Sequence, residues 1–463
     1  MQAAVAAGHP ATTAAGIEIL EDGGSAADAT VAATLASCVA ETVMTGLLGG
    51  GHAIYFDAAS GRARNLDCFV AVPGLGIGRR EVELVQLEVP FGAELVHYAV
   101  GPASCGVPGL PAGLETLWRA HGRLSWPRLV EPALRLAHDG VDFPPAHAAC
   151  LAMLAPVMTM NEGARIYSPQ GELLQPWSRL EQPGLAAALE AVAAEGAAGS
   201  MYRGSIGEAL ISLCAERGGL VTRADLESYE AIWTEPAEVG YLDGRLLTRG
   251  GLSGVPETVP RLPRLRGIGE TDRVLALVKV LEPSAVAGGG DTTNVTVVDR
   301  DGDACAFTTS LGLGSGDFLP GLDLHLNSML GEMDLLHGRL EPGDRMQSMM
   351  APSLVLDAGG LSLAAGAAGG TRLRAALLSS VAGVLDEGLT PDEAVARPRF
   401  YPTREVVNAE RGVDEQALQT LEAGGRLVRR WPERHHYFGG VSLVSRTGAA
   451  GDPRRDGAAT TLR

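Results

Sequence analysis

The sequence lacks long apolar runs and has no excess of basic residues. No stretch of about 18 or more consecutive apolar residues occurs, so no segment is long enough to cross a membrane as a helix. There are 37 Lys and Arg against 55 Asp and Glu, which gives a formal net charge of -18. This charge repels nucleic acids and anionic membranes, so neither is an expected partner. The first residues also lack the basic and apolar segments of a secretory signal, and we expect the protein to be cytoplasmic.

Patterns that hold metals, nucleotides or disulfides are also missing. The six cysteines are scattered and include no Cys-x-x-Cys pair, and the histidines show no metal-ligand spacing. Glycine-rich stretches lack the Lys-Ser/Thr of a phosphate-binding loop. We therefore expect no metal and no cofactor. The cysteines are expected to be small buried side chains in a reducing compartment.

Composition and local patterns predict an α+β protein. With 463 residues, of which 46% are hydrophobic and 20% charged, the chain can bury a sizeable core. Ser25, followed three residues later by Asp28, predicts the start of a helix over residues 26–40. Alternating apolar residues predict a hairpin formed by residues 53–57 and 63–67.

The stretch from residue 288 to residue 310 combines a flexible segment with a strand that begins in threonine. Three glycines and Asp291 form the lead-in, and Thr292 and Thr293 open a β-branched strand that turns back at Asp-Arg-Asp-Gly. An N-terminal-nucleophile hydrolase needs this pattern at its cleavage point. A cut before a threonine supplies a hydroxyl nucleophile and a new α-amine, which titrates near about pH 8 and can accept the hydroxyl proton. A plain structural hairpin is the alternative, because threonine is common in strands.

Short motifs in both halves of the chain occur in one characteristic order. In the first half they lie at residues 3–10, 23–29, 49–51, 107–113 and 132–140. In the second half they lie at residues 292–302, 308–310, 314–316, 326–334, 345–352, 366–372, 393–400 and 451–457. Together they resemble the γ-glutamyltransferase (γ-glutamyltranspeptidase) family of N-terminal-nucleophile hydrolases. The resemblance covers nearly the whole chain except roughly residues 245–290.

The resemblance implies a fold and a cleavage point. The fold would be a four-layer αββα sandwich. Autocleavage of the Asp291–Thr292 bond would give a large segment, residues 1–291, and a small segment, residues 292–463. The two fragments would remain together as one folded unit.

The resemblance also assigns catalytic roles. Thr292 would be the nucleophile, with its own α-amine as the base, and Ser310 would help to organise that amine. Gly369 and Gly370 would form an oxyanion hole, because consecutive backbone N–H groups at a helix N-terminus stabilise a developing oxyanion. The alternatives are a satisfied strand hydroxyl for Ser310 and a tight strand-to-helix turn for the two glycines.

The resemblance places the substrate contacts further along the small segment. Asn327, Glu332 and Asp334 lie where the family recognises the α-amine of the glutamyl group, although acidic loop residues are often only solvated. Ser348 matches the first of two serines that contact the α-carboxylate. The second serine is Met349 in this sequence.

The sequence departs from the family at its substrate clamp. Cys68 and Phe69 occupy the place of an arginine–glutamate pair, and neither side chain can replace a bidentate guanidinium. Leu311 and Gly312 stand where an asparagine is expected after the Thr-Thr-Ser run. The family's longer segment before the cleavage point is also shortened here.

Three functional hypotheses follow. The first is an autoprocessed N-terminal threonine hydrolase or acyltransferase that acts on a γ-glutamyl or related acyl substrate, with water or an amine as acceptor. The second keeps the same threonine but hydrolyses a carbon–carbon bond, as proposed for atypical relatives in actinobacterial 4-alkyl-L-proline pathways. The third is an unprocessed, non-catalytic binding protein. In each case the expected partner is a small molecule.

Overall fold

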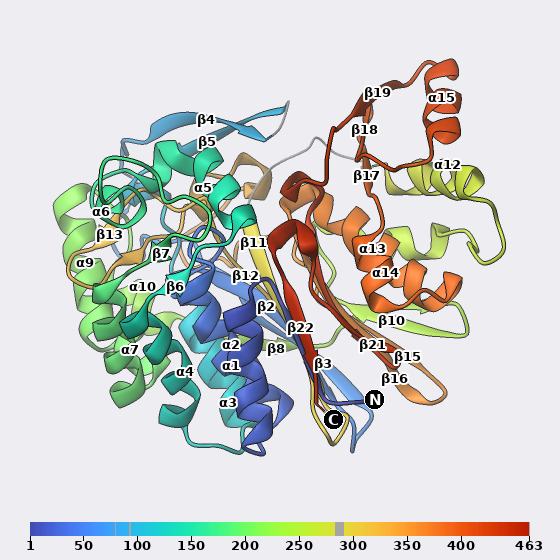
Figure 1. The fold of residues 1–463 in the computed structure, drawn as a ribbon. Helices are drawn as coiled ribbons and strands as arrows, with labels where there is room; N and C mark the ends of the chain where they lie inside the picture. The colour runs from blue at the N-terminus through green and yellow to red at the C-terminus, as the bar shows by residue number, and fades with distance from the viewer. Residues whose placement is uncertain (79, 92–93, 283–290, 463) are drawn as a thin grey trace.

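The hairpin formed by β11 and β12, which we call the threonine hairpin, lies inside a seven-stranded antiparallel sheet (Figure 1). This computed structural model describes residues 1–78, 80–91, 94–282 and 291–462, so the glycines at 288–290 lie outside the described residues. The strand order is β22-β1-β11-β12-β2-β3-β8. These strands are β1 (Ala4–Ala7), β2 (Gly50–Asp57), β3 (Arg62–Cys68), β8 (Ile232–Thr234), β11 (Asp291–Val298), β12 (Ala304–Gly312) and β22 (Ala458–Thr461).

A second antiparallel sheet packs on one face of the first. Its strand order is β21-β20-β16-β15-β10-β9. These strands are β9 (Ala237–Tyr241), β10 (Gly244–Thr248), β15 (Ser353–Asp357), β16 (Gly360–Ala368), β20 (Gly440–Ser445) and β21 (Gly448–Ala450).

The two sheets share a core of small and aliphatic side chains. Alternate residues of a strand point to opposite faces, so Val298 and Ala306 meet the second sheet while Val297 and Phe307 face the helices. The inter-sheet cluster includes Ala4, Ala6, Ile54, Phe56, Val298, Ala304, Ala306, Leu354, Leu356, Ala364 and Val444.

Helices cover the outer face of each sheet (Figure 1). On the seven-stranded sheet these are α1 (Pro10–Glu21), α2 (Ala26–Ala40) and α3 (Leu110–His121), and α4 (Trp126–Asp139) packs on the outer side of α2. On the six-stranded sheet they are α13 (Leu373–Ala382) and α14 (Pro391–Ala396). Every residue of α2 is buried, because its alanines let it lie close to the sheet on one side and to α4 on the other. The predicted α+β class and the four-layer αββα sandwich are confirmed.

The remaining elements surround this sandwich. They include β4 (Val85–Phe91), β5 (Glu94–Val100), α5 (Pro145–Met158), α6 (Gly163–Tyr167), α7 (Pro183–Glu195), α8 (Ala197–Tyr202), α9 (Ser205–Arg217) and α10 (Arg223–Ser228). The others are β6 (Val141–Asp142), β7 (Arg179–Leu180), α11 (Val255–Thr258), α12 (Glu270–Leu281), β13 (Phe318–Leu319), β14 (Leu324–His325), β17 (Phe400–Pro402), β18 (Val406–Ala409), α15 (Glu415–Ala423) and β19 (Leu427–Arg430).

The local predictions are confirmed. The Ser25 hydroxyl accepts a hydrogen bond from the Asp28 N–H at 3.1 Å, and the Asp28 carboxylate accepts one from the Ser25 N–H at 2.9 Å. This capping box starts α2 as the sequence predicts. Strands β2 and β3 form the predicted hairpin, and all six cysteines are buried and free of disulfide bonds. Among the described residues, no helix has both the length and the apolar character needed to span a bilayer.

Both sheets combine strands from either side of the expected cleavage point. In the larger sheet β11 lies between β1 and β12, and β12 pairs with β2. In the smaller sheet β10 pairs with β15. A cut between Asp291 and Thr292 would therefore leave the two fragments joined by strand pairing in both sheets.

The turn of the threonine hairpin is fastened to α2 by Asp299. Its buried carboxylate accepts hydrogen bonds from the N–H groups of Ala26 at 2.8 Å, Asp301 at 2.9 Å and Asp303 at 3.0 Å. We expect Asp299→Ala to lower the free energy of unfolding in urea by about 2–3 kcal/mol, because three backbone donors, one of them buried, lose a charged acceptor. The matched control is Asp301→Ala, whose exposed ion pair with Arg123 contributes less than about 1 kcal/mol. Equal effects of the two changes would contradict this role.

Candidate active site

Thr292 lies where the pairing between β11 and β12 shifts. Asp291 pairs with Gly312 and Thr293 pairs with Thr309, so Thr292 faces two residues, Ser310 and Leu311, instead of one. An extra residue on one strand interrupts the ladder and redirects nearby side chains. Thr292 is 5% exposed, and the Ser310 hydroxyl accepts a hydrogen bond from the Gly312 N–H at 2.8 Å.

A small pocket brings five of the predicted site residues together. Its lining includes Thr292, Ser310, Glu332, Ser348 and Gly370. The rest of the lining is apolar and consists of Phe69, Met329, Leu335, Met349, Met350 and Leu373. The cavity volume is about 30 Å³, which is the space of one water molecule. A substrate would therefore have to displace side chains, and the flexible methionines are the easiest to move.

The two predicted oxyanion glycines form the turn between β16 and α13. Both have left-handed backbones, with φ of 116° at Gly369 and 55° at Gly370, which favours glycine. A Cβ on Gly369 would also lie 2.8 Å from the Cα of Gly439. Gly370 lines the pocket and Gly369 lies one residue before it, outside the lining. A single 3₁₀ turn, Gly370–Arg372, then leads into α13.

Asn327 lies outside the pocket lining and is 0% exposed. Its amide nitrogen donates to the carbonyls of Leu48 at 2.8 Å and Gly106 at 2.9 Å, and its oxygen accepts from the N–H groups of Gly106 and Met329. These four hydrogen bonds to the backbone occupy the side chain that the resemblance gives to the substrate amine.

The other predicted substrate residues differ in their surroundings. The Ser348 hydroxyl, 1% exposed, accepts a hydrogen bond from the Met350 N–H at 3.2 Å. Asp334 is half-buried and lies outside the lining. Burial raises its pKa, against the opposing charges of His337 and Arg372. Glu332 is buried within the pocket, and burial, followed by the charge of Asp334, raises its pKa to about 8.

The chain is similar in sequence and in fold to known proteins. The sequence profile of the Gamma-glutamyltranspeptidase family matches residues 12–257 and 275–462. The chain belongs to this family. The Acylase ACY 1 proenzyme of Pseudomonas sp. (strain SE83) is 28% identical and covers 95% of this chain and 89% of its own. The Glutathione hydrolase proenzyme of Escherichia coli (strain K12) is 25% identical, covering 92% and 86%. The crystal structure of cephalosporin acylase from Bacillus halodurans superposes with a TM-score of 0.85 at 22% identity, covering 100% and 96%.

At the position where the resemblance expects the family's arginine clamp, this chain has Cys68 and Phe69, which form an apolar wall. The Cys68 thiol is buried and donates to the Gly51 carbonyl at 3.2 Å. Phe69 lines the pocket, and its ring stacks on His52 with centroids 5.5 Å apart. Arg345 lies behind this wall, where it donates to the Phe69 carbonyl at 2.5 Å and contacts the Tyr229 hydroxyl. Its guanidinium is thus occupied by hydrogen bonds within the protein.

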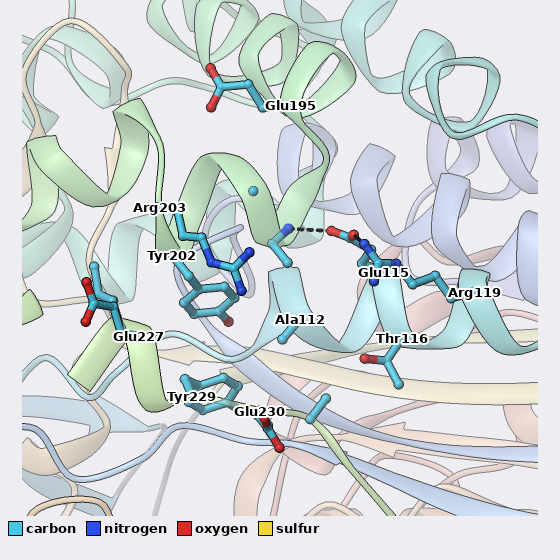
Figure 2. A pocket seen from close by; sticks show the side chains of 14 residues that line it. Ala112, Glu115, Thr116, Arg119, Glu195, Tyr202, Arg203, Glu227, Tyr229 and Glu230 are labelled. Carbon is cyan, nitrogen blue, oxygen red and sulfur yellow. Dashed lines mark hydrogen bonds and ion pairs between the residues drawn. The ribbon is translucent and has the colours of Figure 1, made fainter. Parts of the chain in front are cut away.

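A larger cavity is linked to Phe69 by a hydrogen bond (Figure 2). Its volume is about 430 Å³, and its lining comes from α3, the end of α7, α8 with the residue that follows it, α10 and the segment after α10. Figure 2 shows Tyr202 and Tyr229 together, with Arg203 beside them. The two tyrosine rings stack with their centroids 5.5 Å apart. The Tyr229 hydroxyl donates to the Phe69 carbonyl at 2.6 Å. None of the predicted catalytic residues occurs in this lining, so the smaller pocket is the candidate active site.

Glu41 is a positioning residue that the sequence did not reveal. It follows α2, is 0% exposed, and accepts hydrogen bonds from the Thr12 hydroxyl at 2.7 Å and from the Thr293 hydroxyl. It therefore fixes the residue next to Thr292. A glutamate after an alanine-rich helix has no motif around it, and only the folded chain brings it to β11.

We expect Glu41→Ala to lower the free energy of unfolding by about 3 kcal/mol, because two buried hydroxyls lose a charged acceptor. Urea unfolding of the Glu41→Ala and wild-type chains measures this. Glu21→Ala is the control, since this exposed glutamate ends α1 and its loss should change stability by less than about 0.5 kcal/mol. A Glu41→Ala chain as stable as the control would refute the positioning role.

Proposed function

We propose that this protein is an N-terminal threonine hydrolase or acyltransferase that cleaves its own chain between Asp291 and Thr292. The observation that supports this most is the convergence of Thr292, Ser310 and Gly370 in one buried pocket. The relatives named as proenzymes support the same reading. The products of the cut would be residues 1–291 and 292–463.

After the cut, the new α-amine of Thr292 accepts the proton of its own hydroxyl as the oxygen attacks an acyl carbon. Burial favours the neutral amine, which is the form that acts as a base. Ser310, opposite Thr292 across the register shift, orients that amine. Backbone N–H groups at Gly369 and Gly370 stabilise the oxyanion, and an interaction of this kind contributes about 3 kcal/mol to transition-state stabilisation. The tetrahedral intermediate collapses as the α-ammonium gives its proton to the departing amine, and the acyl group stays on the Thr292 oxygen as an ester. Water or an amine then attacks this ester and releases the acyl group.

The pocket favours an acyl group other than γ-glutamyl. A glutamyl substrate brings an α-carboxylate, and the described lining residues include no cationic side chain that could pair with it. A buried carboxylate without a partner is costly. Phe69 and the methionines suit an apolar acyl chain instead. The 28% identical relative that is named an acylase agrees with this preference.

Hydrolysis of a carbon–carbon bond is the second candidate, favoured by the same apolar wall. A threonine that attacks a ketone and expels a stabilised carbanion needs the nucleophile and the oxyanion hole but no glutamate clamp. Turnover of α-keto acids in preference to anilides would identify this activity.

We expect purified wild-type protein to give two associated fragments by intact mass and gel, the smaller beginning at Thr292. Thr292→Ala should remain a single chain because it lacks the attacking hydroxyl. Thr292→Ser is the matched control, since it keeps a hydroxyl and should still be cleaved. A wild-type chain that stays whole after long incubation would have no free amine at Thr292, and the protein would then be better described as a non-catalytic binding protein.

A further inference from the structure

One oxygen of the Glu332 carboxyl has no hydrogen-bond partner among the described residues, and the side chain lies in the candidate active-site pocket. It is 7% exposed and lines the pocket with Thr292 and Ser310. Its Oε1 atom is fully buried and forms no hydrogen bond among the described residues. A buried polar atom that the protein leaves unpaired is unusual and costs free energy unless a ligand satisfies it.

Gly312 makes the room for this carboxyl. A Cβ on Gly312 would collide with Glu332 Oε1 and would lie 2.8 Å from the Ser328 hydroxyl. Gly312 ends β12 opposite Asp291, so the carboxyl lies beside the expected cleavage point. The observed position of the Glu332 carboxyl therefore requires glycine at position 312.

The surroundings favour the uncharged carboxylic acid. Glu332 forms no ion pair among the described residues. After burial, the like charge of Asp334 is the second cause that raises the pKa of Glu332. His337 and Arg372 act on Asp334. Burial and Asp334 raise the pKa of Glu332 to about 8, so near neutral pH the group carries a proton that it can donate.

Resting on the proposed function, we propose that Glu332 is a specificity-determining residue. Its O–H group donates a hydrogen bond to a neutral acceptor, such as a carbonyl, on the acyl chain bound to the apolar wall. The preferred substrates are thus amides of uncharged acyl groups that carry one hydrogen-bond acceptor. A γ-glutamyl group is disfavoured, because its carboxylate would enter the pocket without a cation.

The test compares two p-nitroanilides that differ by one oxygen, 5-oxohexanoyl and hexanoyl. The measured quantity is the ratio of their kcat/KM values, in which the titration of the nucleophile cancels. We expect wild type to prefer the 5-oxohexanoyl substrate by about tenfold near pH 6, since an unmade hydrogen bond in a built site is costly. As pH rises through about 8, Glu332 loses its proton and offers only acceptors, so the preference should disappear.

Three variants sharpen the result, each first checked for chain cleavage by mass. Glu332→Gln keeps an N–H donor that does not titrate, so its ratio should stay above one and be independent of pH. Glu332→Leu removes the donor, and its ratio should be about one at every pH. Asp334→Asn removes the like charge, so the midpoint of the pH profile should move to lower pH.

A wild-type ratio near one, or a ratio that does not change with pH, would overturn the inference. So would a preference for γ-glutamyl p-nitroanilide that Glu332→Gln abolishes, because Glu332 would then act as an ionised partner of the ammonium. If no chain is cleaved and no substrate turns over, the proposed function fails. The protonation of Glu332, which the inference requires, is then measured on the Thr292→Ala chain by infrared difference spectra against the Thr292→Ala/Glu332→Gln chain near pH 6. Absence of a protonated-carboxyl band overturns the inference.

Discussion

The pairing of α2 with the threonine hairpin is the constraint on which the site depends. At one end of the helix the Asp299 carboxylate holds the Ala26 N–H, and at the other end Glu41 holds the Thr293 hydroxyl. The 15 residues of α2 span about 22 Å, close to the roughly 20 Å from Thr293 to Asp299 along the strand. Helix and strand therefore fix each other at both ends, and Thr292 lies immediately beyond the fixed end.

The residues proposed to perform chemistry and those proposed to select a substrate come from different parts of the fold. Thr292 and Ser310 lie on adjacent central strands, and Gly370 lies in the turn that leaves β16, so these positions are set by the two packed sheets. Glu332, Ser348 and the three methionines all come from the irregular stretch between β14 and β15. Irregular segments tolerate change more readily than central strands. Substitutions in that stretch can thus alter the pocket without disturbing the strands that carry Thr292 and Ser310.

The sequence predicted what is encoded locally. The hairpin around Asp299, the Ser25–Asp28 capping box and the glycine turn before α13 depend on neighbouring residues, so their patterns are visible along the chain. The register shift at Thr292, the approach of Glu41 and the place of Phe69 depend on contacts between residues far apart in sequence. The resemblance assigned Asn327 to the substrate, but the amide is occupied by backbone groups of two other segments, which no local pattern reveals.

The size of residue 312 determines the environment of the Glu332 carboxyl. Any larger residue at position 312 would prevent the Glu332 carboxyl from occupying its present place, because even a Cβ would collide with it. With glycine, the carboxyl moves into the pocket, is removed from water, and favours the protonated form. If Glu332 acts as proposed, an acidic residue that would otherwise accept hydrogen bonds from an ammonium becomes a donor to a neutral group. Under that proposal, the charge that the pocket accepts depends on the size of residue 312 as well as on Glu332.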